Sequence, residues 1–174
     1  MKMELLQMIY YDSAHGQISW NEELQAVVME WKGFAHGDEF QTILIKGIEL
    51  LEQKKSGKLL MDSRKGSAIK AEDQEWVAQQ FVARAYGAGL RYLAMLLPKS
   101  MIAKLSLDRT IDGLGELPYE LVNFSEMEEA VQWLTHPHAK FVLHIYSPFP
   151  IAASISTRQL LHCMMFPGGY SNSH

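Results

Sequence analysis

The sequence predicts an α/β fold in which about four helices pack on a mixed β-sheet that begins with an antiparallel hairpin. Three short segments of β-branched and aromatic residues come first, with no helical pattern between them. From residue 38 onward, segments with the period of a helix alternate with short apolar runs. Because 48% of the residues are hydrophobic, the chain has enough apolar side chains to cover such a sheet.

The first three strands are expected at residues 8–11, 17–20 and 24–31, with a hairpin turn at residues 21–23. A helix follows, because six residues repeat at the spacing of one helix face: Phe40, Ile43, Leu44, Gly47, Ile48 and Leu51. Acidic residues at its start and lysines at its end suit the helix dipole, and Gly57 is a candidate left-handed C-cap.

Alternation then continues to residue 135. In chain order we expect a strand at 58–62, a loop at 63–70, a helix at 71–86, a strand at 92–97, a short helix at 100–105, a glycine-containing loop at 112–116 and a strand at 119–124. Ser125 and Glu128 have the spacing of a capping box for a last helix, whose inner face holds Met127, Ala130, Val131 and Leu134.

Charge divides the chain near Thr135. All 20 acidic residues lie at or before Glu129, whereas residues 136–174 contain only Lys140 and Arg158 as fixed charges. Prolines interrupt that second part, and no clean period survives in it. We therefore expect a folded domain at residues 1–135 and a weakly ordered or loosely docked tail at residues 136–174.

Composition excludes several classes of protein. The net charge of −4 has the wrong sign for a nucleic-acid-binding surface. A single cysteine, Cys163, cannot form an internal disulfide. No secretory signal and no apolar run of about 20 residues is present, so we expect a cytoplasmic protein without membrane insertion.

Several segments of residues 1–135 resemble the SpoIIAA-like small bacterial proteins of the STAS superfamily. The resemblance is carried by residues 28–34, 60–64, 72–76, 94–98 and 128–134. It implies a four- to five-stranded mixed sheet with helices, in a group whose members mostly lack an assigned activity. The related anti-sigma antagonists carry a phosphorylated serine after an aspartate at a strand exit where a helix starts at once. Here Asp62 and Ser63 stand at that place, but residues 64–70 separate them from the next helix, which argues against phosphorylation of Ser63.

The same strand exit is the candidate ligand or partner site. Ligands of open α/β sheets bind at the carboxyl ends of strands, where Arg64 and Lys65 could hold an anion and Asp62 could orient them. Turn chemistry alone also explains Asp62, Ser63, Arg64 and Lys65.

Other constellations have structural explanations that fit at least as well. The carboxylates at residues 72–75 match a helix N-terminus better than an acid–base pair. His136, His138, His144, His162 and Cys163 lack the paired spacing of a zinc site, so no metal is expected. His36, Ser63 and Asp62 could form a triad, but no G-x-S-x-G motif supports it. Neither a Walker A loop nor a dinucleotide fingerprint is present, and no cofactor is expected.

Without a catalytic residue to assign, we expect a non-catalytic binding or regulatory module that docks a protein partner, with a homodimer as one arrangement. The alternative is a carrier of a small apolar, lipid-like ligand, which would suit a chain with 10 methionines. An enzyme of unidentified class is the second alternative. A flat sheet with a filled core would favour partner docking, and a large closed apolar pocket would favour the carrier.

Overall fold

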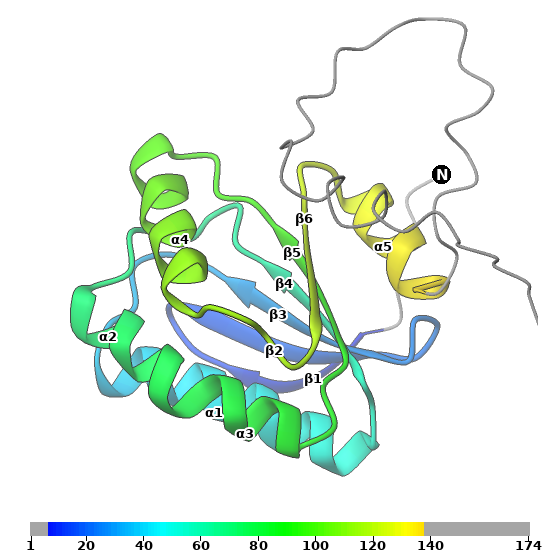
Figure 1. Cartoon of the computed structure of the whole chain (residues 1–174). Helices are drawn as coiled ribbons and strands as arrows, with labels where there is room; N and C mark the ends of the chain where they lie inside the picture. Colours follow the sequence, from blue (N-terminus) through cyan, green and yellow to red (C-terminus); the bar gives the residue numbers. More distant parts are fainter. Residues whose placement is uncertain (1–6, 138–174) are drawn as a thin grey trace, which may run out of the picture. The chain divides into compact units, whose positions relative to one another are not determined.

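Six strands form one sheet in which the spatial order is the chain order, β1-β2-β3-β4-β5-β6, in the computed structural model, which describes residues 7–137 (Figure 1). The first three strands pair antiparallel and β3 to β6 pair parallel. Their bounds are β1 Gln7–Asp12, β2 Gly16–Asn21, β3 Ala26–Trp31, β4 Lys58–Asp62, β5 Tyr92–Leu96 and β6 Glu120–Phe124.

Four helical segments connect or follow the parallel strands. They are α1 Asp38–Lys54, the continuous stretch α2 Ala71–Trp76, η1 Val77–Phe81 and α3 Val82–Gly87, then α4 Met101–Gly113 and α5 Met127–Thr135. The element order and the opening antiparallel hairpin confirm the α/β fold class that the sequence predicts. The sheet has six strands, one more than the four to five that the family resemblance implied, and its first edge strand, β1, contains a bulge between Ile9 and Tyr11.

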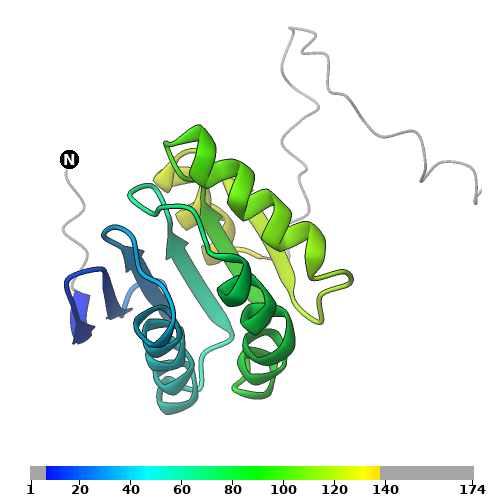
Figure 2. The same ribbon diagram turned by 90° about the vertical axis from the view of Figure 1, so that its left-hand side faces the viewer.

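Three of the helical segments cover the same face of the sheet, and α5 covers the other (Figures 1 and 2). Since the parallel strands follow one another without reversal, right-handed crossovers place every connecting helix on one face. Strand β4 lies between the two layers. Its Leu59 and Met61 face the three helical segments, and its Leu60 faces α5, as expected for a central strand covered on both sides.

Local geometry corrects two details of the sequence prediction. The hairpin turn between β2 and β3 lies at residues 22–25, not 21–23, because Asn21 Oδ1 accepts a hydrogen bond from Leu24 N (2.9 Å) and Gln25 takes a left-handed conformation (φ 52°). Gly57 is not the C-cap of α1. Lys55 takes that position (φ 52°), and the helix closes with hydrogen bonds from Lys55 N to Glu52 O (3.2 Å) and from Ser56 N to Leu51 O (3.1 Å).

Two later helices also differ from their predicted form. Helix α4 runs to Gly113 rather than ending near residue 105, since Leu107 and Thr110 continue its buried face. Helix α5 begins after Glu126 without a side-chain cap, so Ser125 and Glu128 do not form the expected capping box. Its buried Ala130 and Leu134 agree with the predicted inner face.

The predicted boundary near Thr135 and the predicted loose tail remain untested, because residues 138–174 lie outside the described part of the chain.

Asp73 joins the starts of two helices. It lies in the first turn of α2 and is only 1% exposed. Both of its carboxylate oxygens accept hydrogen bonds from the backbone N–H of Gly37, the N-cap residue of α1, at 3.0 and 3.1 Å. One buried carboxylate therefore faces the positive ends of two helix dipoles, which confirms the structural interpretation of the 72–75 cluster for this residue.

Replacement of Asp73 by alanine is expected to destabilise the protein by about 2–3 kcal/mol, because a buried N–H loses a charged acceptor. Glu72→Ala is the matched control: Glu72 lies in the same turn but is exposed, and its loss should cost less than about 1 kcal/mol. Urea unfolding of both variants measures the difference. Equal losses would mean that the link to Gly37 contributes nothing.

Candidate ligand pocket

The four predicted site residues do not form one cluster, because the strand alternation at the end of β4 sends their side chains to different places. Side chains alternate between the two faces along β4, so Asp62 points to the same face as Leu60, which is the face that α5 covers. Its carboxylate accepts hydrogen bonds from Arg64 Nε (3.0 Å), Arg64 Nη2 (2.7 Å) and the Arg64 backbone N–H (3.1 Å). Lys65 Nζ lies 2.8 Å from Glu30 Oε1.

Both cations of this cluster thus have carboxylate partners in their own chain. Hydrogen bonding to Asp62 raises the pKa of Arg64, and hydrogen bonding to Glu30 raises the pKa of Lys65. An anion would compete with these partners. The assignment of Asp62, Arg64 and Lys65 to a ligand or partner site remains a prediction.

Ser63 lies apart from the other three and lines a pocket on the opposite face. It is only 6% exposed, although it is the first loop residue after β4. Its backbone is fixed by hydrogen bonds from Ser63 N to Leu96 O (3.1 Å) and from Gly66 N to Ser63 O (2.8 Å). The structure therefore brings one of the four predicted residues to a cavity.

The conceivable catalytic triad is not assembled. Asp62 is bound to Arg64 on one face, Ser63 lies on the other, and the ring of His36 packs beside Phe34 at 5.2 Å between centroids. No hydrogen bond between these three residues occurs in the described part of the chain. Within residues 7–137 no group of three potential metal ligands occurs either. Of the residues considered for a metal site, His136 lies within this range, whereas His138, His144, His162 and Cys163 lie outside it.

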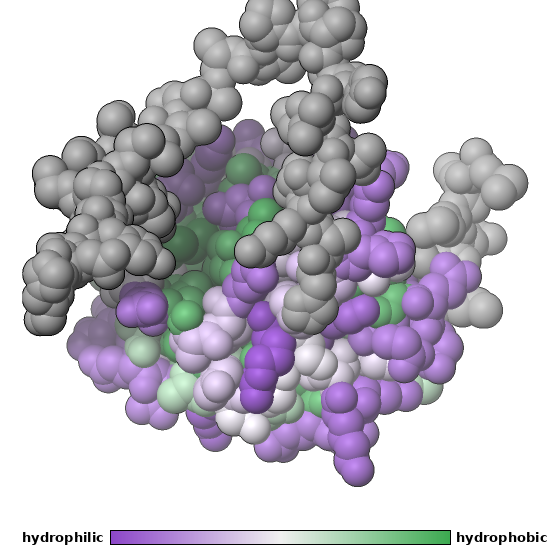
Figure 3. Space-filling model, turned by 45° about the vertical axis from the view of Figure 1, so that its right-hand side comes forward, coloured by the Kyte–Doolittle hydropathy of each residue, from purple (hydrophilic) through white to green (hydrophobic). Residues whose placement is uncertain are grey.

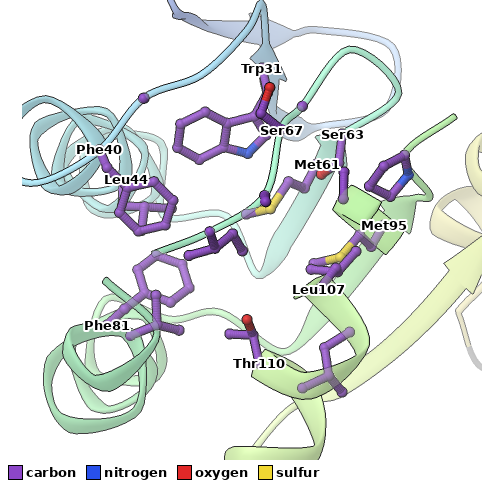
Figure 4. Close-up of a pocket in the computed structure, with 18 of the residues that line it drawn as sticks. Trp31, Phe40, Leu44, Met61, Ser63, Ser67, Phe81, Met95, Leu107 and Thr110 are labelled. Atoms are coloured by element: carbon purple, nitrogen blue, oxygen red, sulfur yellow. The ribbon is translucent and has the colours of Figure 1, made fainter. Parts of the chain in front are cut away.

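The pocket lies between the sheet and the helical segments α1, η1 and α4 (Figure 4). Its cavity measures about 80 Å³. The floor comes from β3, β4 and β5, and the walls come from the helices and from the loop after β4. Its lining residues are Trp31, Gly33, Ala35, Phe40, Leu44, Met61, Ser63, Gly66, Ser67, Ala68, Ile69, Val77, Phe81, Leu93, Met95, Pro98, Ala103, Leu107, Thr110, Ile111, Leu114, Tyr119 and Leu121.

The helices leave this space because they do not all approach the sheet equally. Helix α1 packs closely on β2 and β3, whereas the α4 backbone approaches no single strand to the same extent (Figure 2). The inward face of α4 contributes small residues, Ala103 and Thr110, beside Leu107. Short side chains on a helix that stands off the sheet leave part of the interlayer unfilled.

One widened turn completes the wall. In η1 the Val82 N–H bonds to Val77 O, five residues back, as in a π-helix. Such turns are often found at functional sites. Here Val77 and Phe81 both line the pocket. On the opposite wall, Ser106 of α4 links that helix to the loop after β4. Its hydroxyl accepts a hydrogen bond from Ile69 N (2.9 Å) and donates one to Ile69 O (3.1 Å).

The chemistry of the lining is uniform. No Asp, Glu, Lys, Arg, His or Cys side chain belongs to it. Its Tyr119 is 7% exposed, and burial raises the pKa of the Tyr119 hydroxyl to about 12. Thr110 donates its hydroxyl to Ser106 O at 2.8 Å. Such a lining offers neither a general base nor an activated nucleophile.

Sequence reasoning found Ser63 but not the rest of this pocket. The sequence contains one indication of the pocket, because α4 carries alanine, serine and threonine on its buried face. Trp31, the last residue of the strand predicted at residues 24–31, lies in the core, stacked on Phe40 of α1 with 5.1 Å between ring centroids.

On the outside of the molecule, charged and polar side chains mix with smaller apolar areas (Figure 3). The largest exposed apolar side chains of α4 are Met101, Ile102 and Leu105, which are 69%, 73% and 50% exposed. Among residues 7–137 there is no helix both long and apolar enough to span a bilayer.

Comparison with known proteins gives a likeness in fold. No family model matches the chain, and no curated protein matches it. A solved structure of an uncharacterised DUF3478-family protein from Shewanella loihica is similar to it, with 14% identity over 75% of this chain and 93% of that one and a TM-score of 0.44. That protein is described as having a SpoIIAA-like fold, the fold that the sequence resemblance implied. The likeness concerns the fold, and nothing about activity or partners follows from it.

Proposed function

We propose that this protein is a non-catalytic binding module that holds a small, mainly apolar molecule in the pocket between the sheet and α4. The supporting observation is the lining itself, which is almost wholly apolar and carries no ionisable side chain except Tyr119. Pockets of this composition bind through burial of apolar surface, with a few polar groups that set orientation. They lack the paired roles that a reaction requires.

The shape of the pocket suits a slender ligand. Ser63 follows the carboxyl end of β4, whereas Tyr119 precedes the amino end of β6. By the sheet register, Ser63 lies beside Leu97 and Tyr119 beside Arg91, so the two ends are about 20 Å apart along the strands. An unbranched aliphatic chain fits that length.

The cavity is smaller than the roughly 150 Å³ that admits benzene in an engineered core, so a ligand would have to displace side chains. Met61 and Met95, whose sulfurs lie in the pocket, are suited to this because methionine has flexible, polarisable side chains (Figure 4). Helix α4, which approaches the sheet less closely than α1 does, is a wall that can adjust.

Extraction of the purified full-length protein with organic solvent, followed by gas chromatography and mass spectrometry, tests this function. We expect one discrete lipophilic compound, in proportion to the protein and absent from an unrelated protein prepared identically. Failure to extract such a compound, together with failure of the protein to bind a soluble aliphatic ligand such as 2-nonanone, would refute the proposal.

Docking of a protein partner is the second candidate function, and the exposed apolar side chains of α4 favour it. Lys99, Lys104 and Arg109 lie around Met101, Ile102 and Leu105, and none of these three cations forms an ion pair with a described residue. A partner that fits this surface would present apolar side chains bordered by carboxylates.

Ile102→Asp and Lys104→Glu should each abolish such docking while stability changes by less than about 0.5 kcal/mol, because both side chains are exposed. Cross-linking in a lysate, identification of the product and titration of that purified partner measure the effect. Lys58→Glu, on the strand β4, is the charge-matched control. A partner captured equally by all variants, or self-association lost in both α4 variants, would count against docking of a different protein.

A further inference from the structure

Three buried side chains of the pocket, Trp31, Ser63 and Tyr119, have hydrogen-bonding groups without a partner among the described residues, and the first two lie at the end of the pocket opposite Tyr119. Trp31 is 7% exposed and Ser63 is 6% exposed. Within the described residues, neither the Trp31 indole N–H nor the Ser63 hydroxyl makes a hydrogen bond. Neither atom is fully enclosed, because among the described residues Asn21 Nδ2 alone is a fully buried side-chain nitrogen or oxygen without a partner, so both groups are accessible to a ligand that enters the pocket.

Both groups lie at the same end of the pocket. Trp31 is the last residue of β3 and Ser63 follows the last residue of β4, and these strands are neighbours in parallel register, with Glu30 opposite Asp62. Figure 4 shows the Trp31 ring and the Ser63 side chain together at one end, with Phe81 and Thr110 at the other. This end of the pocket therefore offers two hydrogen-bond donors, and the Tyr119 hydroxyl lies at the other end.

The two groups are also held in place before any ligand arrives. The Trp31 ring is stacked on Phe40 with an interplanar angle of 16°. Ser63 is fixed by its backbone hydrogen bonds to Leu96 and from Gly66. Donors that are already oriented lose little conformational freedom when they bind.

Resting on the proposed function, we infer that the pocket selects an uncharged aliphatic ligand with a carbonyl oxygen, which accepts hydrogen bonds from Trp31 and Ser63. An indole N–H can only donate, so the ligand must supply an acceptor at this end. Arg64 and Lys65, the two cations that follow Ser63, are paired with Asp62 and Glu30, and no cation belongs to the lining of the pocket.

A charged head group has no counter-ion here. A carboxylate would lose its hydration in an apolar pocket without gaining a free cation, and an ammonium would find no carboxylate. A ketone, an aldehyde or an ester has an acceptor and no charge.

Four nine- or ten-carbon ligands separate these properties: 2-nonanone, nonanoate, nonylammonium and 2-methyl-1-nonene, which has the shape of the ketone without its oxygen. Each is titrated at pH 7 into full-length protein with ¹³C-methyl methionine, and the shifts of the Met61 and Met95 methyl signals give the dissociation constant. We expect the ketone to bind at least about tenfold more tightly than either ion.

Ser63→Ala removes a hydroxyl and little else, so it should weaken binding of the ketone by about three- to tenfold and leave binding of the alkene unchanged. Trp31→Phe removes the N–H together with part of a buried ring, so it should weaken binding of the ketone about three- to tenfold more than binding of the alkene. Equal losses for ketone and alkene would show that the two residues act through packing, which overturns the inference. Tight binding of nonanoate would overturn it as well and leave the proposed function standing. Absence of binding by all four ligands would refute the proposed function itself.

Discussion

Replacement of Ala103 by phenylalanine is expected to abolish binding of 2-nonanone, with a loss of affinity of about 10- to 100-fold or more. Ala103 lies on the inward face of α4, is 2% exposed and lines the pocket. A benzyl group at this position would fill space that the ligand chain needs, which removes the burial of several methylene groups at about 0.8 kcal/mol each. Calorimetric titration of the full-length variant measures the loss.

Ile102→Phe is the control for this variant. It places the same side chain on the next residue of the same helix, where residue 102 is exposed and outside the pocket. Its affinity for 2-nonanone should remain within about twofold of the wild type. Retained binding in Ala103→Phe, or an equal loss in both variants, would show that the ligand does not occupy the space beneath α4.

Replacement of Ala130 by phenylalanine is expected to destabilise the protein by about 3 kcal/mol, which lowers the melting temperature of a chain of this size by about 6–12 °C. Ala130 of α5 is fully buried against the opposite face of the sheet, in a core with Leu60, Ala94 and Leu134, and it borders no pocket. Extra atoms there must force neighbouring side chains out of place.

The same substitution at Ala103 should cost less, about 1–2 kcal/mol, because part of the space that it enters is unfilled and the flexible side chains of Met61 and Met95 can move. Thermal and urea unfolding of Ala103→Phe and Ala130→Phe therefore compare how tightly the two faces of the sheet are packed, because the same side chain is introduced on each face. Similar losses at both positions would mean that the layer beneath α4 is as tightly packed as the layer beneath α5.

Much of the fold could be predicted from the sequence, because periodicity reports which side chains share a face. The apolar stripe from Phe40 to Leu51 located α1, and the unbroken run of Leu59, Leu60 and Met61 located a strand covered on both sides. Details set by backbone conformation were missed. Nothing in the pattern favoured Lys55 over Gly57 as the left-handed residue that ends α1.

The candidate site was harder to predict, since periodicity does not reveal whether an inward face is filled. Ser63 was predicted as a site residue because it directly follows a strand, and it does line the pocket. The same reasoning grouped it with Asp62, but alternation in β4 sends adjacent side chains to opposite faces. The spacing between α4 and the sheet depends on contacts between distant segments, such as that of Ser106 with Ile69.

The position of a bound aliphatic ketone tests the central claim most directly. In the complex of the full-length protein with 2-nonanone, nuclear Overhauser effects should connect ligand protons to the Met61 and Met95 methyl groups inside the pocket and to the Trp31 ring at the end that offers the two donors. Met101, on the outer face of α4, should show none. Contacts to Met101 without contacts to Met61 and Met95 would place the ligand on the outer surface and contradict a binding site between the sheet and α4.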